Sequence, residues 1–146
     1  MRALGVDVGA VRVGVAVSDP DGVVATPLCS LQVEPGADEA QGVRGVAARL
    51  AGLARDQGCG TVVVGLPRSL AGRDTASTRA ARQVAEALRA EGVSVALWDE
   101  RLSSAEAERV LLAAGRRRRQ RRVERDPVAA TIVLQGWLDA RRRGGV

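Results

Sequence analysis

The sequence of 146 residues contains no histidine, tyrosine or phenylalanine, and all 22 of its basic residues are arginine. Without histidine, a Ser–His–Asp triad, a Cys–His dyad and a zinc site with histidine ligands are excluded. Without lysine, the lysine of a Walker phosphate-binding loop is excluded. Because two tryptophans are the only aromatic residues, we do not expect a base-stacking platform of the kind that single-strand binders use. Any catalysis must therefore use carboxylates, arginine, hydroxyls or thiols.

Cysteines and long apolar runs are also scarce. Cys29 and Cys59 are far apart in the sequence, so we expect two reduced thiols rather than a disulfide. We find no targeting segment and no apolar run long enough to span a bilayer, which predicts a cytoplasmic protein without a membrane partner. The length predicts a single domain over residues 1–146 with a core of its own.

Positive charge is the main feature of the composition, with a formal net charge of +5. The excess lies mostly in Arg116–Arg125 and Arg141–Arg143. Clustered arginine favours a polyanionic partner, and nucleic acid is the first candidate. The alternative is a solvated helix face or tail that binds nothing.

Valine-rich runs around Gly9 predict the first part of a sheet. Two short runs, Ala3–Val8 and Arg12–Ser18, flank a turn, and a third run at Val23–Val33 follows the turn sequence Asp19–Gly22. We therefore expect an antiparallel meander of three strands.

The rest of the chain alternates helical and strand-like patterns. Two parallel strands joined by helical crossovers complete a mixed five-stranded α/β sheet with helices on both faces. Asp126 is predicted to cap the last helix, with Pro127 in its first position. The predicted elements are helices over Ala40–Gln57, Thr75–Glu91 and Ser103–Gly115, a last helix from Asp126, and strands over Thr61–Val64 and Val93–Trp98.

Acidic residues fall at the ends of these elements. Asp7 is on the first strand and Asp99-Glu100 follows the fifth, so these acids should meet at the edge where the parallel strands end. The last helix could add Asp126. Clustered carboxylates favour Mg²⁺ or Mn²⁺, and two such ions can hydrolyse a phosphodiester without histidine.

Each acid also has a structural interpretation. Asp7 could pair with Arg12 across the hairpin, and Asp99 and Glu100 could be strand-end charges paired with Arg101. Asp126 could be a helix cap and nothing more. The residues alone leave both interpretations open.

The order of the motifs resembles the YqgF family, also called RuvX, which is related to the RuvC Holliday-junction resolvases. The resemblance covers nearly the whole chain. It implies an RNase H-like fold and a nuclease that acts in 5′-end maturation of pre-16S ribosomal RNA. The matching motifs are Gly5–Gly9 with Arg12–Ala16, Val64–Pro67 followed by Gly72, Trp98–Ser103, and the arginine block with Asp126 and Ala129–Gln135.

The same resemblance implies roles for individual residues. Asp7, Glu100 and Asp126 would be the catalytic carboxylates that bind the divalent metal, with Asp99 as the alternative second ligand. Arg12 and Arg101 would face phosphate or orient the acids. The residues that would grip the nucleic-acid backbone are Arg117, Arg118, Arg119, Arg121 and Arg122.

Three positions depart from the family pattern, and other functions compete. Pro127 follows the third acid where the family usually has a helix-compatible residue, Val84 stands where the second helix often has phenylalanine, and Arg68 stands at a commonly apolar loop position. The alternative substrates are a Holliday junction, which a homodimer would bind, or general duplex DNA. A non-catalytic nucleic-acid-binding protein is the alternative of another class. An actin-like or sugar-kinase nucleotide binder shares the Asp-x-Gly hairpin but needs a much longer chain.

Overall fold

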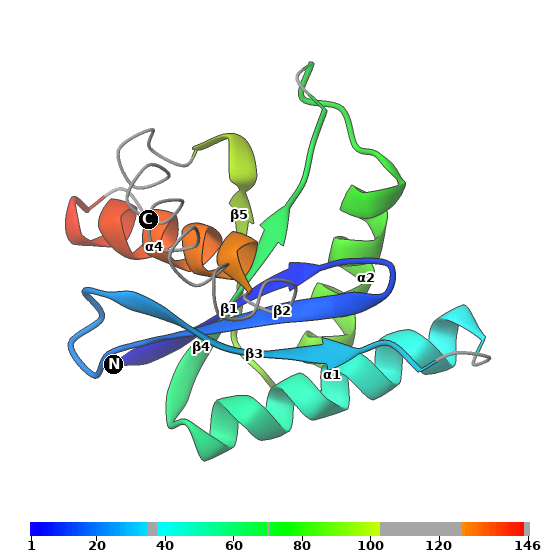
Figure 1. Cartoon of the computed structure of the whole chain (residues 1–146), viewed down its shortest axis with the longest axis horizontal. Coiled ribbons are helices and arrows are strands. Elements are labelled where there is room, and N and C mark those ends of the chain that lie inside the picture. The colour runs from blue at the N-terminus through cyan, green and yellow to red at the C-terminus, as the bar shows by residue number, and fades with distance from the viewer. Residues whose placement is uncertain (35–37, 70, 103–126, 145–146) are drawn as a thin grey trace, which may run out of the picture.

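A computed structural model describes residues 1–34, 38–69, 71–102 and 127–144, which contain a five-stranded sheet in the order β3-β2-β1-β4-β5 (Figure 1). The three N-terminal strands pair antiparallel, and the other two run parallel to β1. The predicted mixed sheet is confirmed. Its strands are β1 (Arg2–Val8), β2 (Arg12–Ser18), β3 (Ala25–Gln32), β4 (Cys59–Leu66) and β5 (Val95–Asp99).

Helices cover both faces of this sheet, as predicted. On one face lie α1 (Glu39–Asp56) and α2 (Ala76–Ala90), and on the other lies α4 (Val128–Arg142) (Figure 1). A short 3₁₀ turn, η1 (Glu100–Leu102), follows β5 directly. The predicted helix at Ser103–Gly115 lies outside the described residues. Within the described ranges, no helix is long and apolar enough to cross a bilayer.

The start of β3 differs from the prediction by two residues. One carboxylate oxygen of Asp19 accepts hydrogen bonds from the backbone N–H groups of Val23 and Val24, at 2.7 and 3.0 Å. These two valines therefore belong to the turn, and the strand begins at Ala25.

The predicted position of the last helix cap is wrong by one residue. Pro127 occupies the N-cap position of α4, with φ −78° and ψ 65°, and Val128 is the first helical residue. The Pro127 carbonyl accepts hydrogen bonds from both the backbone N–H and the hydroxyl of Thr131, at 3.1 and 2.9 Å. Since the N-cap carbonyl is the first acceptor of a helix, these bonds fix where α4 begins.

Alternation along β1 divides its side chains between two cores. Leu4 and Val6 are fully buried in the core beneath α1 and α2, together with residues such as Leu50. Ala3 belongs to the core beneath α4. Because successive side chains of a strand point to opposite faces, Gly5 and Asp7 lie on the α4 face with Ala3.

Glycines bring α4 unusually close to the sheet. A Cβ added at Gly5 would lie 2.6 Å from the Cβ of Leu134 and 2.9 Å from the carbonyl oxygen of Ala130. The strand residues that contact α4 in this way form a glycine seam, consisting of Gly5, Gly14 and Gly65, opposite Leu134, Pro127 and Val133 respectively. The helix backbone thus lies almost directly on the strands, at the level where Asp7 is found.

Candidate active site

Asp7 and Glu100 meet at the predicted edge of the sheet. Asp7 is the penultimate residue of β1, and Glu100 is the first residue after β5. Their carboxyl groups share a hydrogen bond, and both residues are half-buried. Glu100 packs over Gly65 of β4, where an added Cβ would lie 3.4 Å from Cγ of Glu100.

The surroundings of the two carboxyl groups favour their protonated forms. Burial is the main cause that raises the pKa of Glu100 to about 7, and the nearby charges of Asp7 and Asp99 raise it further. Burial also raises the pKa of Asp7, which the hydrogen bond from Glu100 partly offsets. A half-buried pair of this kind is stable when a proton or a cation compensates its charge.

Oxygen donors of this type fit a hard divalent cation better than a soft one. Asp7 and Glu100 are two such donors, and the described residues contain no cluster of three or more acidic or sulfur ligands. The predicted third acid, Asp126, lies outside the described residues. Pro127, the first described residue after it, packs on Gly14, whose Cα partner in the sheet is Asp7. The chain therefore enters α4 beside the strand pair that carries Asp7.

Asp99 faces arginines rather than the carboxyl pair. It accepts hydrogen bonds from the backbone N–H of Arg101 at 2.9 Å and from its guanidinium Nη2 at 2.7 Å. Arg68 adds an ion pair at 3.5 Å. The hydrogen bond from Arg101 is the main cause that holds the pKa of Asp99 below its usual range. The structural interpretation thus applies to Asp99, whereas the partner of Glu100 is Asp7 and not Arg101.

The predicted phosphate-binding arginines are only partly described. Arg101 is exposed and lies next to Glu100 in η1. Arg12 is exposed at the start of β2, where its Cα partner is Gln32, while Asp7 is opposite Gly14. The side chain of Asp7 contacts that of Glu100. The arginines that lie outside the described residues are Arg117, Arg118, Arg119, Arg121 and Arg122.

The sequence does not predict two further residues that lie near the site. Arg68 and Asp74, in the segment between β4 and α2, form an ion pair at 3.3 Å, and Arg68 continues to Asp99. The one indication in the sequence is that Arg68 stands at a loop position that is commonly apolar in the family. The partner of this arginine is evident only from the fold, because Asp99 is 31 positions further along the sequence.

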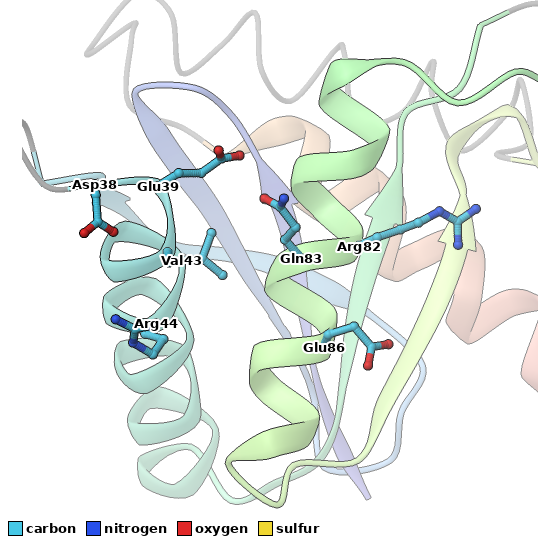
Figure 2. A pocket seen from close by; sticks show the side chains of 8 residues that line it. Asp38, Glu39, Val43, Arg44, Arg82, Gln83 and Glu86 are labelled. Carbon is cyan, nitrogen blue, oxygen red and sulfur yellow. The ribbon is translucent and has the colours of Figure 1, made fainter.

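A separate groove lies on the opposite face of the sheet, between α1 and α2 (Figure 2). It has a volume of about 700 Å³, and Val43, Arg44 and Gln83 are among its lining residues. None of the predicted site residues lines it. The candidate active site is therefore the carboxylate edge and not this groove.

Comparison with known proteins identifies the family of this chain. A family model described as "RuvX: Holliday junction resolvase" matches residues 1–140. The chain belongs to the RuvX family. It is thus a nuclease, a hydrolase of phosphodiester bonds, and the resemblance in its motifs is confirmed.

RuvX relatives match almost the entire chain. A protein of Mycobacterium sp. strain KMS is 48% identical over 143 residues, which cover 97% of this chain and 81% of the relative. A protein of Nocardia farcinica is 44% identical over 146 residues, covering 96% and 78%. Both carry the name "Putative pre-16S rRNA nuclease".

Solved structures establish the fold of this RuvX chain. Thermus thermophilus RuvC matches with a TM-score of 0.66 at 16% identity, covering 99% of this chain and 98% of RuvC. The T. thermophilus RuvC complex with a Holliday junction substrate matches with a TM-score of 0.64, also at 16% identity, covering 99% and 97%. The predicted RNase H-like fold is confirmed.

Proposed function

We propose that this chain cleaves phosphodiester bonds in the precursor of 16S ribosomal RNA, at its 5′ end, with a divalent cation bound by Asp7, Glu100 and Asp126. The observation that carries the proposal is the hydrogen-bonded Asp7–Glu100 pair at the edge where parallel strands end. The substrate comes from the names of relatives that match 97% of this chain. A ribosomal substrate would place the activity in the cytoplasm.

Mg²⁺ or Mn²⁺ is the cation that suits this donor set. When bound, such a cation lowers the pKa of a coordinated water and stabilises negative charge on the phosphate and leaving oxygens. Asp7 and Glu100 would lose their shared proton and present carboxylate oxygens to the cation. Asp126 is proposed as the third ligand because α4 begins beside Gly14, the Cα partner of Asp7.

Arginines would supply the positive charge that binds the substrate backbone. Arg101 is exposed beside Glu100, and Arg12 is exposed on the hairpin that contains Asp7. Guanidinium groups bind phosphate through two parallel hydrogen bonds, which orients the scissile bond as well as attracting it. The basic residues Arg117, Arg118, Arg119, Arg121 and Arg122 would extend this contact along the backbone.

Holliday-junction resolution is the second candidate. The family description and the fold shared with RuvC favour it. A four-way junction has two-fold symmetry, so this activity requires two copies of the chain with both sites on one side.

A cleavage assay with paired variants tests the proposal. Wild-type protein, Asp7→Asn and Glu100→Gln are each incubated with end-labelled precursor 16S RNA, a four-way DNA junction or plain duplex DNA, in Mg²⁺, Mn²⁺ or EDTA. We expect cleavage of the RNA only with metal, and a loss of at least about a hundredfold in each variant, since metal-assisted stabilisation is worth several kcal/mol. Asp56→Asn and Glu86→Gln are matched controls, because both residues are exposed on helices of the opposite face.

Two other results of this assay would change the proposed function. Preferred cleavage of the junction would replace the ribosomal substrate with the second candidate. Binding without cleavage of any substrate would overturn the nuclease assignment and favour the non-catalytic nucleic-acid-binding protein.

A further inference from the structure

Charges of alternating sign connect the segment between β4 and α2 to the candidate active site. Asp74 forms an ion pair with Arg68 at 3.3 Å, Arg68 forms one with Asp99 at 3.5 Å, and Asp99 binds Arg101 at 2.7 Å. We call this series the arginine relay; it consists of Asp74, Arg68, Asp99 and Arg101. It ends beside Glu100 of the carboxyl pair.

The segment that carries Arg68 is held firmly at its base. The Thr78 hydroxyl, which is fully buried, donates a hydrogen bond to the Pro67 carbonyl at 2.6 Å. The Thr75 and Thr78 side chains also complete a reciprocal capping box at the start of α2. The backbone from which Arg68 extends is therefore held by the buried Thr78 and by the capping box that Thr78 forms with Thr75.

The far end of the segment contacts Arg101 directly. The Ser69 carbonyl accepts a hydrogen bond from the Gly72 N–H at 2.8 Å, which closes a turn, and Gly72 has a φ of +79°. A Cβ at Gly72 would lie 3.0 Å from Nη1 of Arg101. The guanidinium thus lies against the glycine on one side and is bound by Asp99 on the other.

Exposure separates the two arginines that bind Asp99. The Arg68 side chain is 28% exposed and its Nε is buried without a directed hydrogen bond among the described residues. The Arg101 side chain is 40% exposed, whereas that of Asp99 is only 13% exposed. Arg101 is therefore the more accessible of the two arginines to a substrate phosphate, while Arg68 compensates the Asp99 charge from a less exposed position.

We propose that Arg68 is a positioning residue of the nuclease site, which acts through Asp99 to hold the Arg101 guanidinium in place for a substrate phosphate. This inference rests on the proposed function. It goes beyond it because Arg68 would act through its ion pair with Asp99 and not on the substrate itself.

The relay restricts the conformational freedom of the Arg101 side chain before substrate binds. An exposed arginine that pairs with a single carboxylate loses much side-chain entropy when it binds phosphate. Asp99 is fixed between two guanidinium groups, so Arg101 is already oriented before substrate arrives. Lysine at position 68 would keep the charge but not the planar fork that reaches both Asp74 and Asp99.

A double-mutant cycle tests this coupling. The dissociation constant of a fluorescein-labelled RNA with the 5′ precursor sequence is measured in EDTA at several salt concentrations, and KM and kcat are measured with Mg²⁺. The variants are Arg68→Ala, Arg101→Ala, the double variant and Arg68→Lys. Arg89→Ala is the matched control, since it removes an exposed ion pair with Glu86 on α2.

We expect Arg101→Ala to weaken binding by on the order of tenfold and to reduce the salt slope by about one. Arg68→Ala should raise KM and the dissociation constant severalfold with little change in kcat, and should add nothing in the double variant. Arg68→Lys should recover only a small part of the loss. Arg89→Ala should bind as wild type does.

Several outcomes would overturn the inference. Additive losses in the double variant would mean that Arg68 contacts the substrate itself. Full recovery by Arg68→Lys would reduce its role to general attraction, and a lower melting temperature with unchanged binding would make the relay purely structural. A wild-type protein that binds but does not cleave would refute the nuclease and still allow the cycle to be read. A wild-type protein that does not bind the RNA would refute both.

Discussion

The two faces of the sheet are formed by the same strands but differ in how they pack against their helices. Beneath α1 and α2, large side chains such as Leu4 and Val6 fill the space and are completely buried. Beneath α4, the same strand presents Gly5 and Asp7, so the helix approaches the backbone and a carboxylate lies next to it. Both faces bury an apolar core, and the second face also carries a tight, partly polar site. One strand with a period of two can therefore serve both purposes.

Substitutions at neighbouring residues of β1 can perturb each face of the sheet separately. Leu4→Ala should destabilise the protein by about 2–5 kcal/mol, because it removes buried apolar contacts and leaves a cavity. Urea unfolding followed by circular dichroism measures the effect. We expect the cleavage rate per folded molecule to be unchanged, and a loss of activity beyond the unfolded fraction would show that the two faces are coupled.

Gly5→Ala should damage the other face by the opposite means, since it adds an atom where there is no room. A methyl group 2.6 Å from the Leu134 Cβ and 2.9 Å from a helix carbonyl must push α4 away from the sheet. Overpacking of this kind costs about 1–3 kcal/mol. We expect the cleavage rate of the variant to be reduced even at a temperature where the variant is fully folded.

The control for that variant is another glycine-to-alanine change. A Cβ at Gly45, exposed on α1, would meet nothing within 4 Å, so Gly45→Ala should stabilise the protein by about 0.5–1 kcal/mol without affecting cleavage. A neutral Gly5→Ala would refute the importance of the glycine seam.

Titration of the carboxyl pair should produce the smallest and most specific difference. The native state holds a proton on Glu100 up to a pKa of about 7, whereas the ordinary value is 4.5, so between these values the native state binds more protons than the unfolded state. In EDTA, the melting temperature should therefore fall as the pH rises from about 5 to about 7. Differential scanning fluorimetry measures this change.

Two controls sharpen the pH experiment. Glu100→Gln has no proton to lose at this position, so its melting temperature should vary less with pH over the same range. Added Mg²⁺ should reverse the loss near neutral pH in the wild-type protein only. An equal pH dependence in both proteins would place the responsible group elsewhere.

Most of the fold could be predicted because local signals and the long-range arrangement agree. Valine-rich runs with turn residues between them predicted the meander, and apolar residues at helical spacing predicted α1 and α2. The proximity of Asp7 and Glu100 followed from a general rule for parallel strands, since both residues stand where such strands end.

The remaining features depend on contacts between distant parts of the chain. Pro127 was expected inside the last helix, but its carbonyl accepts the bonds of Thr131 and thereby becomes the cap. The glycine seam is visible only when Gly5, Gly14 and Gly65 lie side by side under one helix. Residues that matter through a partner in another strand or loop leave no local pattern that periodicity could reveal.

The attachment of α4 to the sheet has a consequence for how the molecule matures during translation. The amide of Gln135 accepts a hydrogen bond from the Ala25 N–H and donates one to the Val23 carbonyl, both at 2.9 Å, so α4 is joined to a turn made more than a hundred residues earlier. The ribosome synthesises all five strands, α1 and α2 before α4. The face beneath α1 and α2 can therefore close on the nascent chain, while the face with Asp7 is completed only once α4 has been made. This nuclease thus acquires the face that carries its candidate active site late in its own synthesis.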